Sequence, residues 1–305
     1  MGLMAASTVI ERIAVKQPAA TKAALWVVAR GYMMFPRKRH WLFDKLAADL
    51  DYLVPVTARL GNGMKMRVPW NDEVGRAIYE TGWYEPSTVR TVASLLRPGM
   101  VFIDAGANIG QYTLLASKIV GPTGAVHSFE PSPTTFSWLS RNVRKNSGRN
   151  IHLNRLALGD REKTTTLYMS TPENTGSTSM SQQYNFSGKT ADVHCITLDS
   201  YLAQHGIMSV NVMKVDVEGA ELEVLKGAEK LLTGPNGPHL VVEFQESSQA
   251  RFGSSCAKLA AFLTDRGYKL MTIQPPEPHD VDRFGAYTLN VLAIPVISDN
   301  LRASS

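Results

Sequence analysis

The chain has 305 residues, with 32 lysines and arginines against 27 aspartates and glutamates, so its formal net charge is +5. The whole excess lies in residues 1–50, which hold eight basic and three acidic side chains, and the rest of the chain is neutral. A neutral body excludes the uniformly basic surface of a nucleic-acid-binding protein. An apolar fraction of 44% excludes wholesale disorder.

Residues 1–50 predict a basic helical segment that breaks at Pro36. Its early apolar run is shorter than the roughly 20 residues that span a bilayer, and Glu11 and Arg12 interrupt a signal-peptide pattern. Aromatic and basic residues alternate between positions 22 and 45, which suits peripheral contact with an anionic membrane. The alternative is an appendage that packs on the main domain or on a second subunit of a homo-oligomer.

Cys195 and Cys256 are too few for a disulfide framework and form no C-x-x-C pair, which predicts a reducing, cytoplasmic location. Residues 51–98 form the next region and begin with a β-hairpin around Gly61-Asn62-Gly63. The predicted elements here are strands Val56–Leu60 and Met64–Val68 and helices Asp72–Tyr79 and Pro86–Leu96.

Residues 99–298 alternate short apolar runs with helical patterns, which predicts an α/β domain with a doubly wound, mainly parallel sheet. The runs are Val101–Ala105, Ala125–Phe129, Ile151–Leu156, Val210–Val215, His239–Phe244, Lys269–Ile273 and Leu289–Ile294; the helices include Gln111–Val120, Thr134–Asn146, Ala220–Leu232 and Cys256–Arg266. The last two runs lack an intervening helix, so we expect an antiparallel pair.

The alternation is interrupted between residues 163 and 198, where Lys163–Met169 and Asp192–Leu198 predict two extra strands. The polar loop between them, Ser170–Lys189, contains Tyr184 and Phe186, which could stack on a sugar. A solvent-exposed loop explains the same composition. Trp83 and Tyr84 are open to the same two interpretations, as acceptor-side residues or as core beneath the hairpin.

The first strand of the domain runs into the loop Asp104-Ala-Gly106-Ala107-Asn108-Ile-Gly110. A dinucleotide fingerprint needs glycine where Asn108 stands, which disfavours a nicotinamide-dependent oxidoreductase, and no P-loop lysine follows. An acidic strand end suits a cationic ligand without phosphate, and S-adenosylmethionine is one. The second strand ends in Phe129-Glu130-Pro131, where Glu130 could accept hydrogen bonds from both ribose hydroxyls.

The fourth strand carries charged residues near its end, in Met213-Lys214-Val-Asp216-Val-Glu218-Gly219. Lys214 and Asp216 share one face because side chains alternate along a strand, so they form a pair, which is either structural or next to a ligand. Glu243 lies near the end of the fifth strand.

Together with Thr197-Leu-Asp199, these motifs and the stretch Met213–Ala228 resemble the FkbM family of S-adenosylmethionine-dependent methyltransferases over about residues 75–275. The resemblance implies a seven-stranded, Rossmann-like class I methyltransferase sheet and methylation of hydroxyl groups on sugars and secondary metabolites. It implies cofactor contacts at Asp104, Gly106, Ala107, Asn108, Gly110, Glu130, Pro131 and, more weakly, Ala157 and Leu158.

Transfer to an alcohol needs a base, and Asp216, Glu218 and Glu243 stand at suitable strand ends. We expect Asp216 or Glu243 to act as base or polarising group, with Lys214 setting their ionisation and Asp216 also contacting the cofactor. No His/Asp/Glu triplet has convincing spacing for a metal. The prediction is an O-methyltransferase acting on a small-molecule or glycan hydroxyl. N-methylation of another small molecule and a catalytically silent partner protein remain open, whereas a nucleic-acid substrate is disfavoured by the neutral body.

Overall fold

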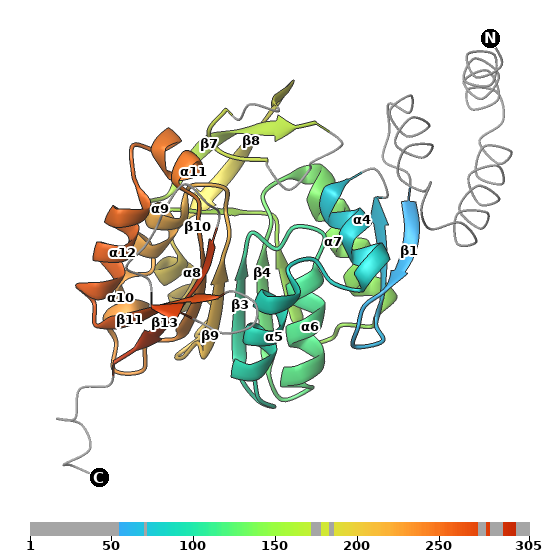
Figure 1. Cartoon of the computed structure of the whole chain (residues 1–305), viewed down its shortest axis with the longest axis horizontal. Helices are drawn as coiled ribbons and strands as arrows, with labels where there is room; N and C mark the ends of the chain where they lie inside the picture. Colours follow the sequence, from blue (N-terminus) through green and yellow to red (C-terminus); the bar gives the residue numbers. More distant parts are fainter. Residues whose placement is uncertain are drawn as a thin grey trace, which may run out of the picture.

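The computed structural model describes residues 55–69, 72–171, 178–182, 186–273, 279–280 and 289–296 (Figure 1). The basic segment 1–50 lies outside the described residues, and so do residues 172–177 of the polar loop and Tyr184. The predictions of membrane contact and of a homo-oligomer made for residues 1–50 therefore stay predictions. In the described part of the chain, no helix is long and apolar enough to cross a membrane.

The central sheet has the strand order β12-β11-β13-β10-β9-β3-β4-β5. The strands are β3 Val101–Ala105, β4 Ala125–Phe129, β5 Ile151–Asn154, β9 Val212–Val215, β10 His239–Phe244, β11 Tyr268–Ile273, β12 His279–Asp280 and β13 Leu289–Pro295. Strands β10, β9, β3, β4 and β5 pair in parallel, while β13 is antiparallel to both of its neighbours. The seven-stranded, mainly parallel sheet is thus confirmed, with the two-residue β12 added at one edge.

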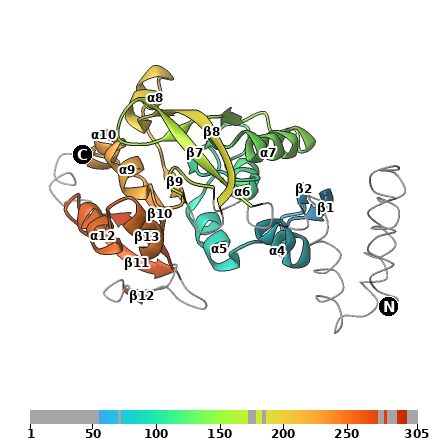
Figure 2. The same ribbon diagram turned by 90° about the horizontal axis from the view of Figure 1, so that it is seen from above.

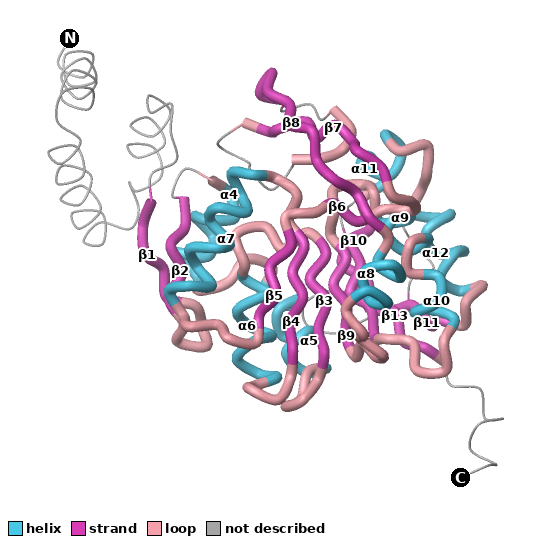
Figure 3. Tube along the Cα trace, turned by 180° about the vertical axis from the view of Figure 1, so that it is seen from behind, coloured by secondary structure: helices cyan, strands magenta, loops and turns pink. Residues whose placement is uncertain are grey.

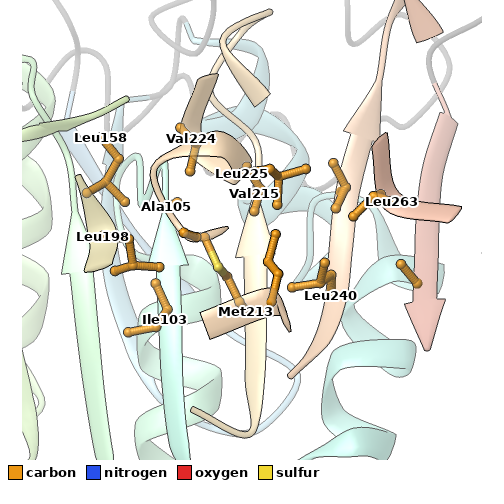
Figure 4. Close-up of a cluster of buried hydrophobic side chains, with 14 of the residues drawn as sticks. Ile103, Ala105, Leu158, Leu198, Met213, Val215, Val224, Leu225, Leu240 and Leu263 are labelled. Carbon is orange, nitrogen blue, oxygen red and sulfur yellow. The ribbon is translucent and has the colours of Figure 1, made fainter. Parts of the chain in front are cut away.

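Helices cover both faces of this sheet because successive side chains along each strand point to opposite sides (Figure 2). Phe102 and Val241 pack with α5 (Pro86–Leu95) and α6 (Gln111–Val120). Ile103 and Leu240 belong to the opposite core, shown in Figure 4, with α8 (Leu198–Gln204), α9 (Glu221–Lys226) and α12 (Cys256–Thr264). The doubly wound architecture follows from these two apolar layers.

The predicted β-hairpin is confirmed as β1 (Pro55–Arg59) and β2 (Lys65–Pro69). It lies beyond the β5 edge of the sheet, beside α4 (Glu73–Thr81) and α7 (Pro133–Lys145) (Figure 3). The buried amide of Asn142, on α7, fastens it: Oδ1 accepts from the Arg67 N–H, and Nδ2 donates to the carbonyls of Arg67 and Ile109. One side chain thereby joins the hairpin to the glycine loop.

A single helix predicted over Ala220–Leu232 is wrong, because the structure divides it into α9 and α10 (Glu229–Thr233). A Cβ on Gly227 would lie 2.0 Å from the Gly159 carbonyl oxygen, so the chain bends where two backbones meet. Asp199 then caps α10 across the fold, accepting from the Lys230 and Leu231 N–H groups. Helices α8 and α11 (Glu246–Arg251) were not predicted.

A second sheet of three strands, β6-β8-β7, contains the two predicted extra strands and adds a third. Ala157 and Leu158 form β6 instead of ending the third strand, which stops at Asn154. Strand β7 (Lys163–Ser170) was predicted, but β8 runs from Phe186 to Ile196 and takes Phe186 out of the loop, since Phe186 pairs with Ser170. The polar composition of β8 reflects its largely exposed first half.

Candidate active site

A cavity of about 490 Å³ lies at the carboxyl ends of β3, β4, β9 and β10. Ligands bind at this edge of open α/β sheets, where neighbouring strand connections diverge. The following predicted site residues line it: Gly106, Ala107, Asn108, Glu130, Pro131, Ala157, Leu158, Lys214, Asp216, Glu218 and Glu243. The structure therefore brings together residues that are up to 137 positions apart.

The glycine loop keeps its shape through left-handed residues and close backbone approaches. Gly106 has φ +83, and a Cβ there would lie 1.8 Å from the Asp216 carbonyl oxygen. Asn108 also has a positive φ, and its Oδ1 accepts from the Ile109 N–H at 2.7 Å. Asparagine tolerates this conformation better than most residues, which explains how it replaces a glycine here.

Asp104 and Gly110 lie outside the cavity wall. Asp104 is fully buried; its Oδ2 accepts from the Thr113 hydroxyl at 2.6 Å, and its Oδ1 has no hydrogen-bond partner. Burial raises the pKa of Asp104, while the Lys214 charge opposes the rise. Gly110 is the residue before α6, and a Cβ there would collide with Leu139. We infer positioning roles for both residues in place of the predicted direct contacts.

Glu130 faces the cavity with both oxygens already held by the main chain. Oε2 accepts from the Asn108 N–H at 3.0 Å, and Oε1 accepts from the Ser132 N–H at 2.9 Å. Burial raises the pKa of Glu130 to about 7, against the lowering effect of these two hydrogen bonds. The carboxyl group is thus fixed in orientation, with lone pairs left to accept from a ligand.

Lys214 is buried beneath the cavity and is surrounded by carboxylates. Its Nζ lies 2.6 Å from Asp216 Oδ2 and 4.6 Å from the centre of the Tyr112 ring. Burial alone would lower the pKa of Lys214, but Asp216, Glu85 and Asp104 together raise it. The predicted Lys214–Asp216 pair is therefore present, and Lys214 stays a cation.

Glu218 and Glu243 are two further carboxyl groups of the cavity wall. Glu243 is 9% exposed, and its Oε2 has no hydrogen-bond partner. Glu218 follows β9 in a left-handed conformation with φ +58. Burial and the charge of Asp216 raise the pKa of both carboxyl groups well above the ordinary value. A carboxyl group with a raised pKa and a free oxygen is suited to proton transfer.

The part of the cavity next to α4 and α5 contains residues that the sequence analysis missed or left open. Glu85 accepts from the Tyr112 hydroxyl at 3.0 Å and from Asn290 Nδ2 at 2.9 Å, and burial raises its pKa. Tyr84 and Arg251 line the cavity as well. Trp83 instead packs under the hairpin, where its ring blocks a Cβ on Gly61. The sequence marked this region by Trp83 and Tyr84 and by Pro86, a typical first helical residue, but no signal pointed to Glu85.

The charges of the described wall are unbalanced. Lysine and arginine contribute only Lys214 and Arg251, whereas six acidic residues line the cavity: Glu73, Glu85, Glu130, Asp216, Glu218 and Glu243. Among the described residues, no group of three or more His, Cys, Asp or Glu side chains is arranged to hold a metal ion. An excess of carboxyl groups over cations on the wall suits a ligand that carries positive charge.

A family model described as the methyltransferase FkbM domain matches residues 104–270, which is more than half of the chain. The chain belongs to the FkbM methyltransferase family. Family membership confirms the resemblance that the sequence motifs indicated and makes this domain an S-adenosylmethionine-dependent methyltransferase domain.

Relatives of this FkbM chain span several kinds of organism. It is 30% identical over 142 residues to Methyltransferase 1 of Beauveria bassiana, covering 41% of this chain and 57% of that protein. It is 28% identical to the 31-O-demethyl-FK506 methyltransferase FkbM of Streptomyces tacrolimicus, covering 59% and 77%. The hexuronic acid methyltransferase AglP of Haloferax volcanii is 31% identical, covering 66% and 78%. The chain thus spans little more than half of the first of these relatives.

Among solved structures, a methyltransferase FkbM from Methylobacillus flagellatus aligns with a TM-score of 0.42 and 14% identity, covering 74% of this chain and 60% of that one.

The residues of this FkbM cavity fit S-adenosylmethionine. Its volume lies within the range of about 300–1,000 Å³ for small-molecule sites. The nucleoside end has apolar walls at Phe129, Leu156 and Leu158, beside the Glu130 carboxyl group that would accept the ribose hydroxyls. The excess of carboxylates complements a sulfonium and an ammonium group. Oε2 of Glu243, which has no hydrogen-bond partner, is a further polar atom that could bind a ligand.

Replacing Glu130 with glutamine should weaken S-adenosylmethionine binding about 10- to 100-fold. Losing one hydrogen bond to a charged acceptor costs about 1.5–3 kcal/mol. Calorimetric titration of the purified chain measures the change, and Glu162→Gln, at an exposed position, is the matched control. An unaltered dissociation constant for Glu130→Gln would exclude Glu130 from the cofactor site.

Proposed function

We propose that the protein transfers the methyl group of S-adenosylmethionine to a hydroxyl group of a saccharide or saccharide-bearing metabolite. The observation that carries the proposal is the buried, unpartnered carboxyl oxygen of Glu243 on the cavity wall. An alcohol is a weak nucleophile until a base takes its proton, and Glu243 is placed to do so.

Glu243 is the better base of the two candidates that the sequence left open. Asp216 is ion-paired with Lys214 at 2.6 Å, so its Oδ2 is already engaged. Glu243 has no such partner at Oε2, and its raised pKa makes it a stronger proton acceptor once ionised. We assign the base to Glu243 and a positioning role to the Lys214–Asp216 pair.

S-adenosylmethionine supplies an electrophilic methyl group on a positively charged sulfur. The acceptor oxygen forms the new bond to the methyl carbon in line with the carbon–sulfur bond, whose electron pair stays on sulfur. Glu243 takes the hydroxyl proton as this happens. Since an in-line displacement depends mostly on alignment, holding both partners in one walled cavity supplies much of the acceleration.

The saccharide class is supported by the acceptor end of the cavity and by relatives. Carboxylates accept hydrogen bonds from hydroxyl groups, and the Tyr84 ring offers an apolar surface beside them. The Streptomyces relative is named for 31-O-demethyl-FK506 and the Haloferax relative for a hexuronic acid. The excess of carboxylates here favours an uncharged acceptor over a uronic acid, because like charges repel in a buried site.

A matched acceptor panel tests the proposal. Methyl transfer from radiolabelled cofactor is measured to neutral methyl glycosides, to the corresponding methyl uronides and to primary amines of similar size. We expect product with at least one neutral glycoside and roughly tenfold less with its uronide counterpart. Transfer to the amines alone, or to none of the panel, would contradict the saccharide proposal.

The proposal includes a reducing, cytoplasmic setting, which suits the two free, buried thiols of Cys195 and Cys256. A lipid-linked glycan acceptor would give the basic residues 1–50 a use, namely to hold the enzyme against an anionic membrane surface.

A further inference from the structure

Two carboxyl groups of the cavity wall stand next to each other in the fold. Glu243 is near the end of β10, Glu218 follows β9, and these two strands are hydrogen-bonded neighbours. Both side chains line the cavity. Burial and the charges of Asp216 and Glu221 raise the pKa of both carboxyl groups, and the charge of Glu218 further raises the pKa of Glu243. Two buried carboxyl groups that share one site do not both ionise readily.

Acidic groups outnumber the cations packed around this pair. Two carboxyl groups and one hydroxyl group face it, namely Asp216 directly after β9, Glu221 on α9 and Tyr84 between α4 and α5, and the Cys256 thiol faces it from α12. The neighbouring cations are Lys214, which is ion-paired with Asp216, and Arg251, whose Nη2 donates to Ser248 Oγ.

We propose that the Glu218–Glu243 carboxyl pair holds a proton in the cofactor-free enzyme and releases it when the sulfonium charge of S-adenosylmethionine enters the cavity. Glu243 Oε2, which has no partner and belongs to a side chain 91% buried, is the atom that changes state. The inference rests on the proposed role of Glu243 as base and explains when that base becomes available.

The Glu218–Glu243 pair returns to its initial protonation state after each turnover. Proton release leaves Glu243 as a carboxylate beside the bound cofactor. During transfer, Glu243 takes the proton of the acceptor hydroxyl, the methyl carbon–sulfur bond breaks, and sulfur keeps the electron pair and becomes uncharged. The pair is then protonated again, as in the cofactor-free enzyme. Each turnover therefore releases one proton to solvent, and the carboxyl pair releases it when the cofactor binds.

A consequence is that the cavity distinguishes S-adenosylmethionine from S-adenosylhomocysteine by charge. The affinity for the sulfonium ligand should rise with pH, by up to about tenfold per pH unit, until the pair is ionised. The affinity for the uncharged thioether should vary much less over the same range. Product would then be displaced by substrate cofactor more easily as pH rises.

Calorimetric titration of the full chain at about pH 6.5 tests this inference, in one buffer of small and one of large ionisation enthalpy. We expect the apparent enthalpy of S-adenosylmethionine binding to differ between the two buffers by the amount that corresponds to the release of about one proton. The apparent enthalpy of S-adenosylhomocysteine binding should be nearly the same in both buffers. Both ligands carry the same α-amino group, which is mostly protonated below its usual pKa of about 7.7–8.0, so the difference isolates the sulfonium.

Glu243→Gln and Glu218→Gln should each remove most of the proton release, whereas Glu80→Gln, at an exposed position on α4, should retain it. Equal proton release for both ligands, or release that survives in both cavity variants, would overturn the inference. The pH dependence of the two wild-type affinities is a second measurement that needs no variant. A negative acceptor panel with positive proton release would instead count against the saccharide substrate alone.

Discussion

Replacing Lys214 with methionine should lower the free energy of unfolding by about 3–5 kcal/mol, the usual cost of breaking a buried ion pair on one side. Lys214 is 2% exposed and is the cation that Asp216, Glu85 and Asp104 share. Methionine fills much of the same volume, so the change in the free energy of unfolding comes mainly from the three uncompensated carboxylates and only slightly from packing. Urea unfolding followed by circular dichroism measures this change.

Lys226→Met, at an exposed position on α9, is the matched control and should change stability by less than 1 kcal/mol. The loss in free energy of unfolding caused by Lys214→Met should become smaller as pH falls from about 8 to about 5, because protonation removes the negative charge of carboxylates that have lost their cation. A loss that is small at every pH would show that the three carboxylates do not depend on Lys214 for their charge balance.

Replacing Glu243 with glutamine should reduce the rate of methyl transfer about 100- to 10,000-fold, the usual contribution of a general base. The same variant should be more stable than the wild type at alkaline pH. The folded-state pKa of Glu243 is raised, so the folded protein binds its proton more tightly than the unfolded chain. Stability is therefore greatest below the ordinary glutamate pKa and falls as pH rises through the raised value.

Glutamine cannot ionise, so the stability of the Glu243→Gln variant does not fall with rising pH for this reason. Thermal unfolding at about pH 5 and pH 8 should show variant and wild type close together in acid and the variant higher in alkali, with turnover measured on the same samples. Glu80→Gln should match the wild type in both assays. Wild-type turnover by Glu243→Gln would remove Glu243 from the mechanism and leave Asp216 as the candidate.

Much of the fold was predictable because it depends on local patterns. The strands Val101–Ala105, Ala125–Phe129 and His239–Phe244 were predicted to the residue, since continuous apolar runs bounded by turn residues are unambiguous in a buried sheet. The break at Gly227 was not predictable, because it depends on the carbonyl of Gly159, 68 residues away. Local helical periodicity continues through that position regardless.

That the glycine loop and Glu130 meet at one cavity was predictable for the same reason, since both directly follow apolar strands. The part of the cavity formed by residues 73–85 was harder to predict. Glu85 and Tyr84 precede the part of the chain that the family model matches, and nothing in their neighbourhood marks a buried carboxylate. Glu85 even occupies a left-handed conformation immediately before a proline, which no propensity would favour. Only the tertiary structure shows that it faces Lys214.

The side-chain amide of Gln111 connects the segment that contains Tyr84 and Glu85 to the helix that follows the glycine loop. Its Oε1 accepts from the Tyr84 N–H at 2.7 Å, and its Nε2 donates to the Tyr84 carbonyl at 2.9 Å, as a neighbouring strand would. Gln111 is also the first residue of the helix that follows the glycine loop. One side chain therefore fixes the distance between the Tyr84 backbone and the glycine loop. We expect that substitutions at other positions of residues 73–85 can change the shape of the cavity while this distance is kept.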